Sequence, residues 1–223
     1  MAQPLEISGT VALVAGGSGG LGRPIALELS RRGATVYSTS RSTLDSDRDI
    51  SADLRSPEEA ERVVAEVSSR AGRLDIVVNA VGVVAFGDVA NTSVDTIEEL
   101  FLTNTFAHMF LCAAALPRMG KGGVIVGVSG VVAEQNLPGM AAYGASKAAM
   151  RSFNEAFGRE ARRAGVRVLD ARPPHTETGL AGRAISGAAP RFPQGLEPAH
   201  VAARIVDAIA AGDTDLPSAT FGA

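Results

Sequence analysis

A tyrosine and a lysine four residues apart are the pair of side chains in this sequence best suited to acid–base chemistry. Tyr143 and Lys147 lie near the start of a helix predicted over residues 141–164, and side chains four residues apart share one helix face. A phenol with a pKa of about 10 is a poor base at neutral pH, but a nearby ammonium group favours its ionised form. The pair is therefore suited to moving a proton when a hydride is transferred to or from a carbonyl carbon. The alternative is an ordinary helix with an exposed tyrosine and lysine, because this spacing also occurs by chance.

A glycine-rich turn is the second feature suited to chemistry. It lies between a predicted strand over residues 10–15 and a predicted helix over residues 21–32. Glycines in such a turn let a pyrophosphate approach the backbone, and the helix N-terminus offers unpaired N–H donors. The turn therefore predicts a dinucleotide site, and the residues expected to form it are Gly16, Ser18, Gly20, Leu21 and Gly22. A glycine-rich turn without a ligand is the alternative.

The end of the second predicted strand bears on which dinucleotide fits. An acidic residue there would bind the ribose hydroxyls and repel a 2′-phosphate, but the sequence reads Ser40, Arg41 and Ser42. A guanidinium group pairs well with a phosphate, and the flanking hydroxyls of Ser40 and Ser42 are expected to add hydrogen bonds to the cofactor. NADP(H) is therefore the preferred cofactor and NAD(H) the second choice. The alternative is that Arg41 is a solvated surface residue. Asp53 and Leu54 end the next strand, where they are expected to bind the adenine amino group and to pack on its ring, although Asp53 is equally suited to forming a turn.

Predicted strands and helices alternate along the whole chain. This order indicates an α/β fold, a doubly wound parallel sheet of the Rossmann type, with one domain over residues 1–223 and a ligand crevice at the carboxyl ends of the strands. Only eleven residues separate Arg41 from Asp53, too few for a strand and a helical crossover, so the helix between the second and third strands is expected to be absent. Residues 179–195, rich in Gly, Ala and Pro, are expected to form a mobile substrate loop beside the crevice. Three other predicted helices span residues 57–71, 96–119 and 198–211.

These features together resemble the short-chain dehydrogenase/reductase family over nearly the whole chain. The resemblance implies that Tyr143 is the acid/base, that Lys147 lowers its pKa and binds the nicotinamide ribose, and that Asn104 anchors a proton-relay water. It also implies contacts with the cofactor by residues of two further segments. These residues are Asn79, Ala80 and Gly82 in the first segment, and Pro173, Thr176 and Thr178 in the second.

One position departs from the family pattern where a catalytic serine is expected. The residue thirteen positions before Tyr143 is Gly130, and Ser129 precedes it. Neighbouring strand residues point to opposite faces, so Ser129 replaces the missing hydroxyl only if the strand has already turned or bulged there. On that condition Ser129 is the fourth candidate catalytic residue. The departure also motivates an alternative function, a dinucleotide-binding regulatory or scaffold protein with a degraded active site.

The composition narrows the classes of partner. The net charge is −3 and the basic residues are dispersed, which argues against nucleic acid as a partner. Apolar runs are interrupted before they reach membrane-spanning length. The single cysteine, Cys112, and three scattered histidines show no metal-ligand spacing, so no metal site and a cytoplasmic setting are expected.

The function predicted from the resemblance is that of an NADPH-preferring oxidoreductase. It would move a hydride between the nicotinamide and a carbonyl or secondary alcohol of a small or medium hydrophobic substrate. The two long helices over residues 96–119 and 141–164 carry broad apolar faces. In the family such helices imply the interface of a homodimer or homotetramer.

Overall fold

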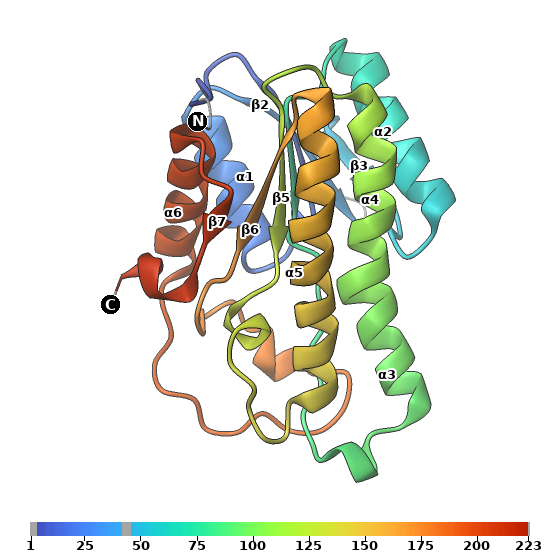
Figure 1. The fold of residues 1–223 in the computed structure, drawn as a ribbon, viewed down its shortest axis with the longest axis vertical. Coiled ribbons are helices and arrows are strands. Elements are labelled where there is room, and N and C mark those ends of the chain that lie inside the picture. The colour runs from blue at the N-terminus through green and yellow to red at the C-terminus, as the bar shows by residue number, and fades with distance from the viewer. Residues whose placement is uncertain (1–3, 42–45, 223) are drawn as a thin grey trace.

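The computed structural model describes residues 4–41 and 46–222. In this part of the chain, seven strands form one parallel sheet in the order β3-β2-β1-β4-β5-β6-β7, with helices on both faces (Figure 1). The strands are β1 (Val11–Ala15), β2 (Thr35–Ser40), β3 (Asp49–Ser51), β4 (Ile76–Asn79), β5 (Val124–Val128), β6 (Arg167–Ala171) and β7 (Asp215–Leu216). The helices are α1 (Gly22–Arg31), α2 (Pro57–Ala71), α3 (Val94–Phe101), α4 (Ala107–Ala115), α5 (Ala141–Ala161) and α6 (Pro198–Ala211). The predicted doubly wound α/β fold is confirmed.

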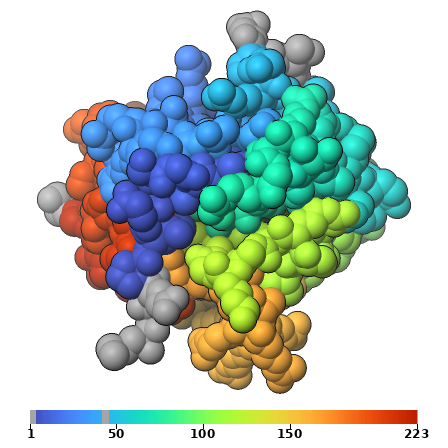
Figure 2. Space-filling model, turned by 90° about the horizontal axis from the view of Figure 1, so that it is seen from above, coloured from blue at the N-terminus to red at the C-terminus, as the bar shows by residue number. Residues whose placement is uncertain are grey.

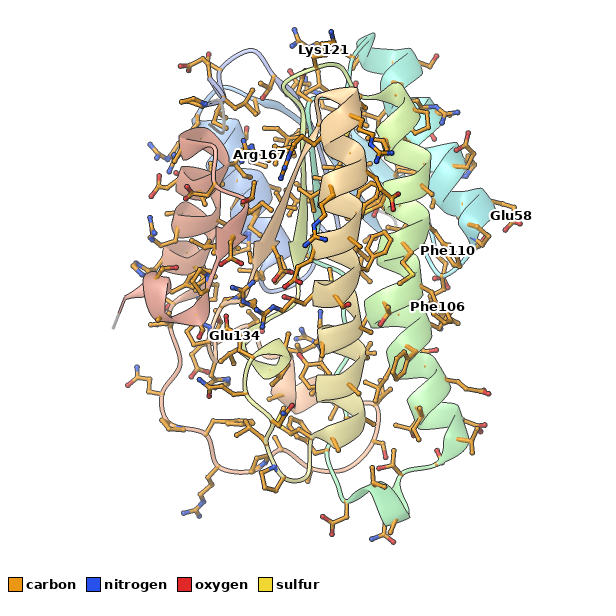
Figure 3. The ribbon with its side chains drawn as sticks, viewed as in Figure 1. Glu58, Phe106, Phe110, Lys121, Glu134 and Arg167 are labelled. Atoms are coloured by element: carbon orange, nitrogen blue, oxygen red, sulfur yellow. The ribbon has the colours of Figure 1, made fainter. Side chains whose placement is uncertain are left out.

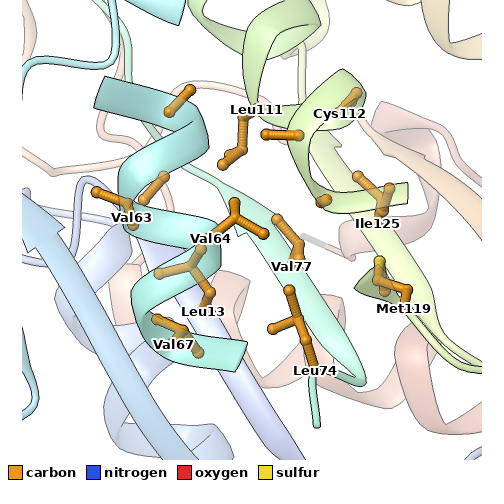
Figure 4. Packing of buried hydrophobic residues seen from close by; sticks show 14 of the residues in the cluster. Leu13, Val63, Val64, Val67, Leu74, Val77, Leu111, Cys112, Met119 and Ile125 are labelled. Atoms are coloured by element: carbon orange, nitrogen blue, oxygen red, sulfur yellow. The ribbon is translucent and has the colours of Figure 1, made fainter. Parts of the chain in front are cut away.

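Two hydrophobic layers enclose the sheet because neighbouring strand residues point to opposite faces. In β1, Leu13 belongs to the layer under α2, α4 and α5, whereas Ala12 and Val14 belong to the layer under α1 and α6. The close-up in Figure 4 shows the first layer, where Val64 of α2 faces Val77 of β4. The sheet is thus buried on both faces, as expected for parallel strands.

The connection between β2 and β3 is short, as predicted. The described residues of this connection, Arg41 and 46–48, form no helix. Ser42, predicted to contact the cofactor, lies outside the described residues. Helix α2 follows β3 and begins as expected from its sequence, with Ser56 accepting a hydrogen bond from the backbone N–H of Glu59 and Pro57 in the first turn.

The long helix predicted over residues 96–119 is not uniform. A π-helical segment, Leu102–Phe106, separates α3 from α4, and it contains Asn104. The whole run, Val94–Arg118, is long and apolar enough to cross a membrane, contrary to the expectation for apolar runs, but more than half of its most apolar stretch is buried inside the protein. Its composition is therefore that of a core helix. Phe106 and Phe110 lie on its outer side (Figure 3) and their rings are 6.4 Å apart; the homo-oligomer interface stays a prediction.

The two ends of the sheet carry different kinds of connection. At the end seen in Figure 2, short segments lie side by side, and the N–H of Gly122 donates to the carbonyl of Gly165 over 2.9 Å. At the other end, the carboxyl ends of the strands lead into the glycine-rich turn and the substrate loop, 179–195 (Figure 1). Among the described residues, long, irregular segments therefore gather where a ligand crevice is predicted.

Candidate active site

A cavity of about 290 Å³ opens at the carboxyl ends of β4 and β5. Its walls come from the glycine-rich turn, the segments that follow β4, β5 and β6, and the first turns of α5. The predicted site residues that line it are Gly20, Leu21, Ala80, Gly82, Ser129, Tyr143, Lys147, Pro173, Thr176 and Thr178. The tertiary fold therefore brings the predicted phosphate end and the predicted reacting end to one cavity.

Tyr143 and Lys147 are buried at the floor of this cavity. No hydrogen bond to the Tyr143 hydroxyl occurs among the described residues, whereas the Lys147 Nζ donates to the carbonyl of Val128 over 2.9 Å. Burial raises the pKa of Tyr143 to about 12, because a phenolate loses its hydration there. Burial also lowers the pKa of Lys147 to about 8, against the opposing charge of Asp170. Desolvation dominates the pKa of Tyr143, so the phenol is protonated at neutral pH. The lowering of this pKa by Lys147 stays a prediction.

Asn104 uses its amide to hold the cavity wall in place. Its Oδ1 accepts from the N–H of Val83 over 2.8 Å, and its Nδ2 donates to the carbonyl of Val83 over 3.0 Å and to the Ser146 Oγ over 2.9 Å. Both N–H groups of the amide are thus committed to protein partners. Asn104 also lies beside Lys147, since a Cβ at Gly82 would lie 3.2 Å from the Asn104 Oδ1 and 3.3 Å from the Lys147 Nζ. Asn104 positions the cavity wall; its place in a proton relay stays a prediction.

Ser129 does not supply the hydroxyl that the family pattern lacks at Gly130. Its Oγ donates to the Oδ1 of Asp170 over 2.8 Å, and the residue is fully buried. Strand β5 ends at Val128 and Gly130 has φ at +88°, so Ser129 lies between the strand and the turn, with its hydroxyl committed to Asp170. The role predicted for Ser129 is therefore corrected to a structural one. Asp170, which the sequence reasoning missed, also accepts from the Nδ2 of Asn154 over 2.8 Å and pairs with Arg172.

A signal for Asp170 was present in the sequence. A carboxylate inside an otherwise apolar strand must find charged or hydrogen-bonding partners when the strand is buried. Arg172 is that partner, and it also pairs with Glu134, labelled in Figure 3, and with Asp215. The ion-pair cluster ties the segment after β5 to β6 and β7, and so holds the cavity wall that begins at Gly130.

The backbone at position 130 requires glycine. Gly130→Ser is expected to lower the free energy of unfolding by about 1–2 kcal/mol, because a residue with a Cβ is strained at a positive φ. Space is not the obstacle, since the nearest atom to an added Cβ would be 3.9 Å away. Urea unfolding of Gly130→Ser beside Gly120→Ser, a glycine with no positive φ and open surroundings, measures the difference. Equal unfolding midpoints for the two variants would show that no strain is present.

The glycine-rich turn presents unpaired backbone donors. Among the described residues, the N–H groups of Gly20, Leu21 and Gly22 have no hydrogen-bond partner, and they stand at the start of α1. Gly16 and Gly22 pack directly on each other, because a Cβ at Gly22 would lie 2.1 Å from the Gly16 carbonyl oxygen. Ser18 is exposed beside them. The turn therefore has the amide donors and the helix dipole that bind a phosphate.

The predicted adenosine end differs in part from expectation. Leu54 is buried in the core under α2, so its side chain is not free to pack on an adenine ring. Asp53 pairs with Arg55 over 2.5 Å, and Arg55 also pairs with Glu99 over 2.9 Å. Hydrogen bonding from Arg55 lowers the pKa of Asp53, and the charge of Arg41 adds to this. The carboxylate predicted to bind adenine is therefore already engaged by Arg55, a residue that the sequence reasoning missed.

The remaining walls of the cavity are apolar. They are formed chiefly by Val84, Phe86, Val132, Met140 and Phe192. Phe192 belongs to the segment 179–195, which therefore lies beside the cavity; its role as a mobile substrate loop stays a prediction. Such walls exclude water from the Tyr143 hydroxyl and suit a hydrophobic substrate.

Comparison with known proteins agrees with this geometry. The family model for short chain dehydrogenase matches residues 10–188. The chain belongs to the short-chain dehydrogenase family. A hydroxynaphthalene reductase of Aspergillus fumigatus is 35% identical over 178 residues, which are 74% of this chain and 65% of that relative's length. A dehydrogenase/reductase SDR family protein 7-like of Drosophila melanogaster is 28% identical over 95% of this chain and 73% of the relative.

Solved structures of short-chain dehydrogenases have the same fold. One from Streptomyces avermitilis is 31% identical with a TM-score of 0.83, covering 95% of this chain and 88% of that one. Another, from Burkholderia cenocepacia and in complex with NADP, is 25% identical with a TM-score of 0.84, covering 98% of this chain and 99% of that one. The recognition of the family from its motifs is confirmed.

The residues of this short-chain dehydrogenase fit the NAD(P)(H) that the family binds. The unpaired N–H groups at Gly20 and Leu21 suit a pyrophosphate. Asn79, at the end of β4, accepts from the N–H of Val81 but leaves its buried Nδ2 without a partner in the described residues. A buried amide donor in this state costs free energy until it is satisfied. These donors and the protonated Lys147 would hold the phosphates and the polar groups of the dinucleotide.

Proposed function

We propose that this protein is an NADPH-dependent reductase of a carbonyl group in a small or medium hydrophobic substrate. The observation that carries the proposal is the unpaired Tyr143 hydroxyl in an apolar cavity that also reaches the amide donors of the glycine-rich turn. The reductase relatives and the NADP-bound neighbour support the same reaction class.

The chain's own groups account for the proton and for the orientation of the substrate. When bound, the cofactor supplies the hydride for the carbonyl carbon. Tyr143 remains protonated at neutral pH, so it can donate its proton to the carbonyl oxygen as negative charge develops there. Lys147, below its pKa of about 8, keeps a positive charge near this phenol and stabilises the phenolate that remains. The apolar walls exclude water and strengthen both interactions.

Because Gly130 has no hydroxyl, the reaction is expected to be slower than in a site with a serine at this position. Loss of one donor to a developing oxyanion costs about 10²–10³ in rate by analogy with other enzymes. The engagement of Ser129 by Asp170 also favours the second candidate, a dinucleotide-binding regulatory protein. NADPH oxidation measured against a panel of aliphatic and aromatic ketones separates the two. Turnover of any ketone supports the reductase, and tight NADPH binding without turnover supports the regulatory protein.

Arg41 is the proposed determinant of the preference for NADPH. Its guanidinium is exposed, and among the described residues it has no ion pair or hydrogen bond, although its charge acts on Asp53. An arginine in this state can pair with a 2′-phosphate. Arg41→Ala is expected to weaken NADPH binding about tenfold or more, a loss of roughly 1.4 kcal/mol, and to leave NADH binding nearly unchanged.

Fluorescence titration of both dinucleotides measures this effect. Arg159→Ala is the matched control, because Arg159 is an exposed arginine in the last turn of α5, at the opposite end of the molecule. An Arg41→Ala protein that binds NADPH as tightly as the wild type would exclude a role for this residue.

A further inference from the structure

His175 is the one imidazole that faces the cavity among the described residues, and the fold holds it firmly. Residues 175–177 pair with residues 195–196, through hydrogen bonds from the N–H of Leu196 to the His175 carbonyl over 2.9 Å and from the N–H of Glu177 to the Leu196 carbonyl over 3.0 Å. The ring of His175 stacks on Phe192 with centroids 4.7 Å apart and an interplanar angle of 29°. Both rings line the cavity that contains Tyr143.

The orientation of the imidazole leaves one nitrogen uncommitted. Nε2 lies 3.5 Å from the Oε1 of Glu177, and that oxygen is itself held by the N–H of Gly195 over 2.7 Å. A Cβ at Gly195 would lie 2.8 Å from the His175 Cδ2, so the Cδ2–Nε2 edge of the ring faces residues 177 and 195. The Nδ1 is on the other edge and has no hydrogen-bond partner among the described residues.

The Glu177 carboxylate lies on the Nε2 side of the ring, 3.5 Å away. It favours the tautomer with its hydrogen on Nε2, in which Nδ1 is a hydrogen-bond acceptor. An acceptor at the edge of an aromatic stack matches a flat ring that carries a hydroxyl group. The apolar walls of the cavity offer area for such a ring, while the charged residues that line it are Lys147 and Arg183.

We propose that His175, stacked on Phe192 and backed by Glu177, is a specificity-determining residue whose Nδ1 accepts a hydrogen bond from a ring hydroxyl of an aromatic substrate. The inference deepens the proposed function, because it places a hydroxylated aromatic carbonyl compound in the same cavity. Phe86 and Phe192, whose rings are 6.0 Å apart, provide the aromatic surface for such a ring. Without a hydroxyl on the substrate, Nδ1 would be desolvated with no partner, which disfavours binding.

Ligand binding tests the proposal without relying on turnover. The chain contains no tryptophan, so the fluorescence of a bound naphthalene derivative can be followed directly in the protein saturated with NADP⁺. The two naphthol isomers are compared with their methoxy counterparts, which keep the ring but cannot donate a hydrogen bond. We expect the better-bound naphthol to bind about tenfold more tightly than its methoxy counterpart, as one hydrogen bond allows.

Two variants assign the preference to His175. His175→Phe keeps an aromatic ring beside Phe192 and removes the acceptor, so the preference for the naphthol should disappear while the affinity for the methoxy compound stays within about twofold. Glu177→Gln should weaken the preference in part, because the proton on Nε2 loses its carboxylate. Equal binding of the naphthol and methoxy compounds by the wild type, or an unchanged preference in His175→Phe, overturns the proposal.

Kinetics on ketones distinguish this inference from the proposed function. The substrates compared are 2-tetralone and its ring-hydroxylated derivatives. His175→Phe should raise KM for the preferred hydroxylated derivative about tenfold, with kcat and the turnover of unsubstituted 2-tetralone retained. Turnover of simple ketones with no hydroxyl preference overturns the inference alone. A naphthol preference that depends on His175, without turnover of any carbonyl, supports the binding site and overturns the reductase function.

Discussion

Tyr143→Phe is expected to lower kcat/KM for ketone reduction by about 10²–10⁴, the usual contribution of a general acid. The substitution removes only the hydroxyl oxygen, which has no hydrogen-bond partner among the described residues, so it leaves no buried group unpaired. NADPH binding and the unfolding midpoint should therefore be unchanged. NADPH oxidation with a saturating ketone measures the effect.

Tyr37→Phe is the matched control for this result. Tyr37 is the other tyrosine of the chain and is buried in β2, in the core under α2. Its replacement makes the same chemical change away from the cavity, and it should leave the rate of reduction unaltered. A Tyr143→Phe enzyme with full activity would show that another group donates the proton.

Lys147 is expected to make the reaction depend on pH. Its pKa is lowered to about 8, so the ammonium is charged below that pH and neutral above it. The kcat/KM for reduction should be level at neutral pH and fall above about pH 8 with the slope of a single proton. Tyr143, with a pKa of about 12, stays protonated over this range, so the loss belongs to Lys147. Lys147→Met should lower the rate about 10²-fold and abolish this dependence.

The same group links pH to stability, and the sign follows from the direction of the shift. The folded-state pKa of Lys147 is below its ordinary value of 10.5, so the unfolded chain binds this proton more tightly than the folded chain. Stability therefore rises with pH between about 8 and 10.5. Urea unfolding of wild type and Lys147→Met across this range should show the rise only in the wild type.

Lys121→Met provides the control for both measurements. Lys121 is exposed at the end of the molecule away from the cavity (Figure 3), and its replacement should change neither the pH profile of the rate nor that of the stability. A wild-type rate that stays level to pH 10 would contradict the assignment of the ionisation to Lys147.

Local patterns predicted most of the secondary structure. Helix α2 spans Pro57–Ala71 as predicted, because its cap, its first-turn proline and its apolar spacing all agree. Counting residues between Arg41 and Asp53 predicted no crossover helix there, and the described residues of this connection form none. The π-helical segment, Leu102–Phe106, was not predicted, because the apolar pattern of the sequence continues through it. The short strand β7 was also missed, since two residues carry no periodic signal.

The candidate site was predicted unevenly. Tyr143 and Lys147 were correctly placed on one helix, and the glycine-rich turn was correctly placed between a strand and a helix. Both predictions depend only on local geometry. Leu54 was assigned from its place at the end of a strand, and Ser129 as a conditional substitute for the serine missing at Gly130. Both differ from expectation, because Leu54 is buried in the core and the Ser129 hydroxyl is bound by Asp170. Arg55 and Asp170 were missed although each has an ion-pair partner two residues away, because the contacts that join them to the site, with Glu99 and Ser129, come from distant parts of the chain.

The sequence by itself determined the family, the parallel sheet and the choice of Tyr143 and Lys147 as the proposed acid–base pair, since each depends on residue types at fixed short spacing. Only the tertiary structure decided the protonation of that pair and the surroundings of the substrate. Burial keeps Tyr143 protonated and makes Lys147 easier to deprotonate, and desolvation depends on every element packed around a group. In the same way, His175 faces the cavity because Glu177, Phe192 and Gly195 surround its ring, and the contacts with Phe192 and Gly195 come from a segment well along the chain.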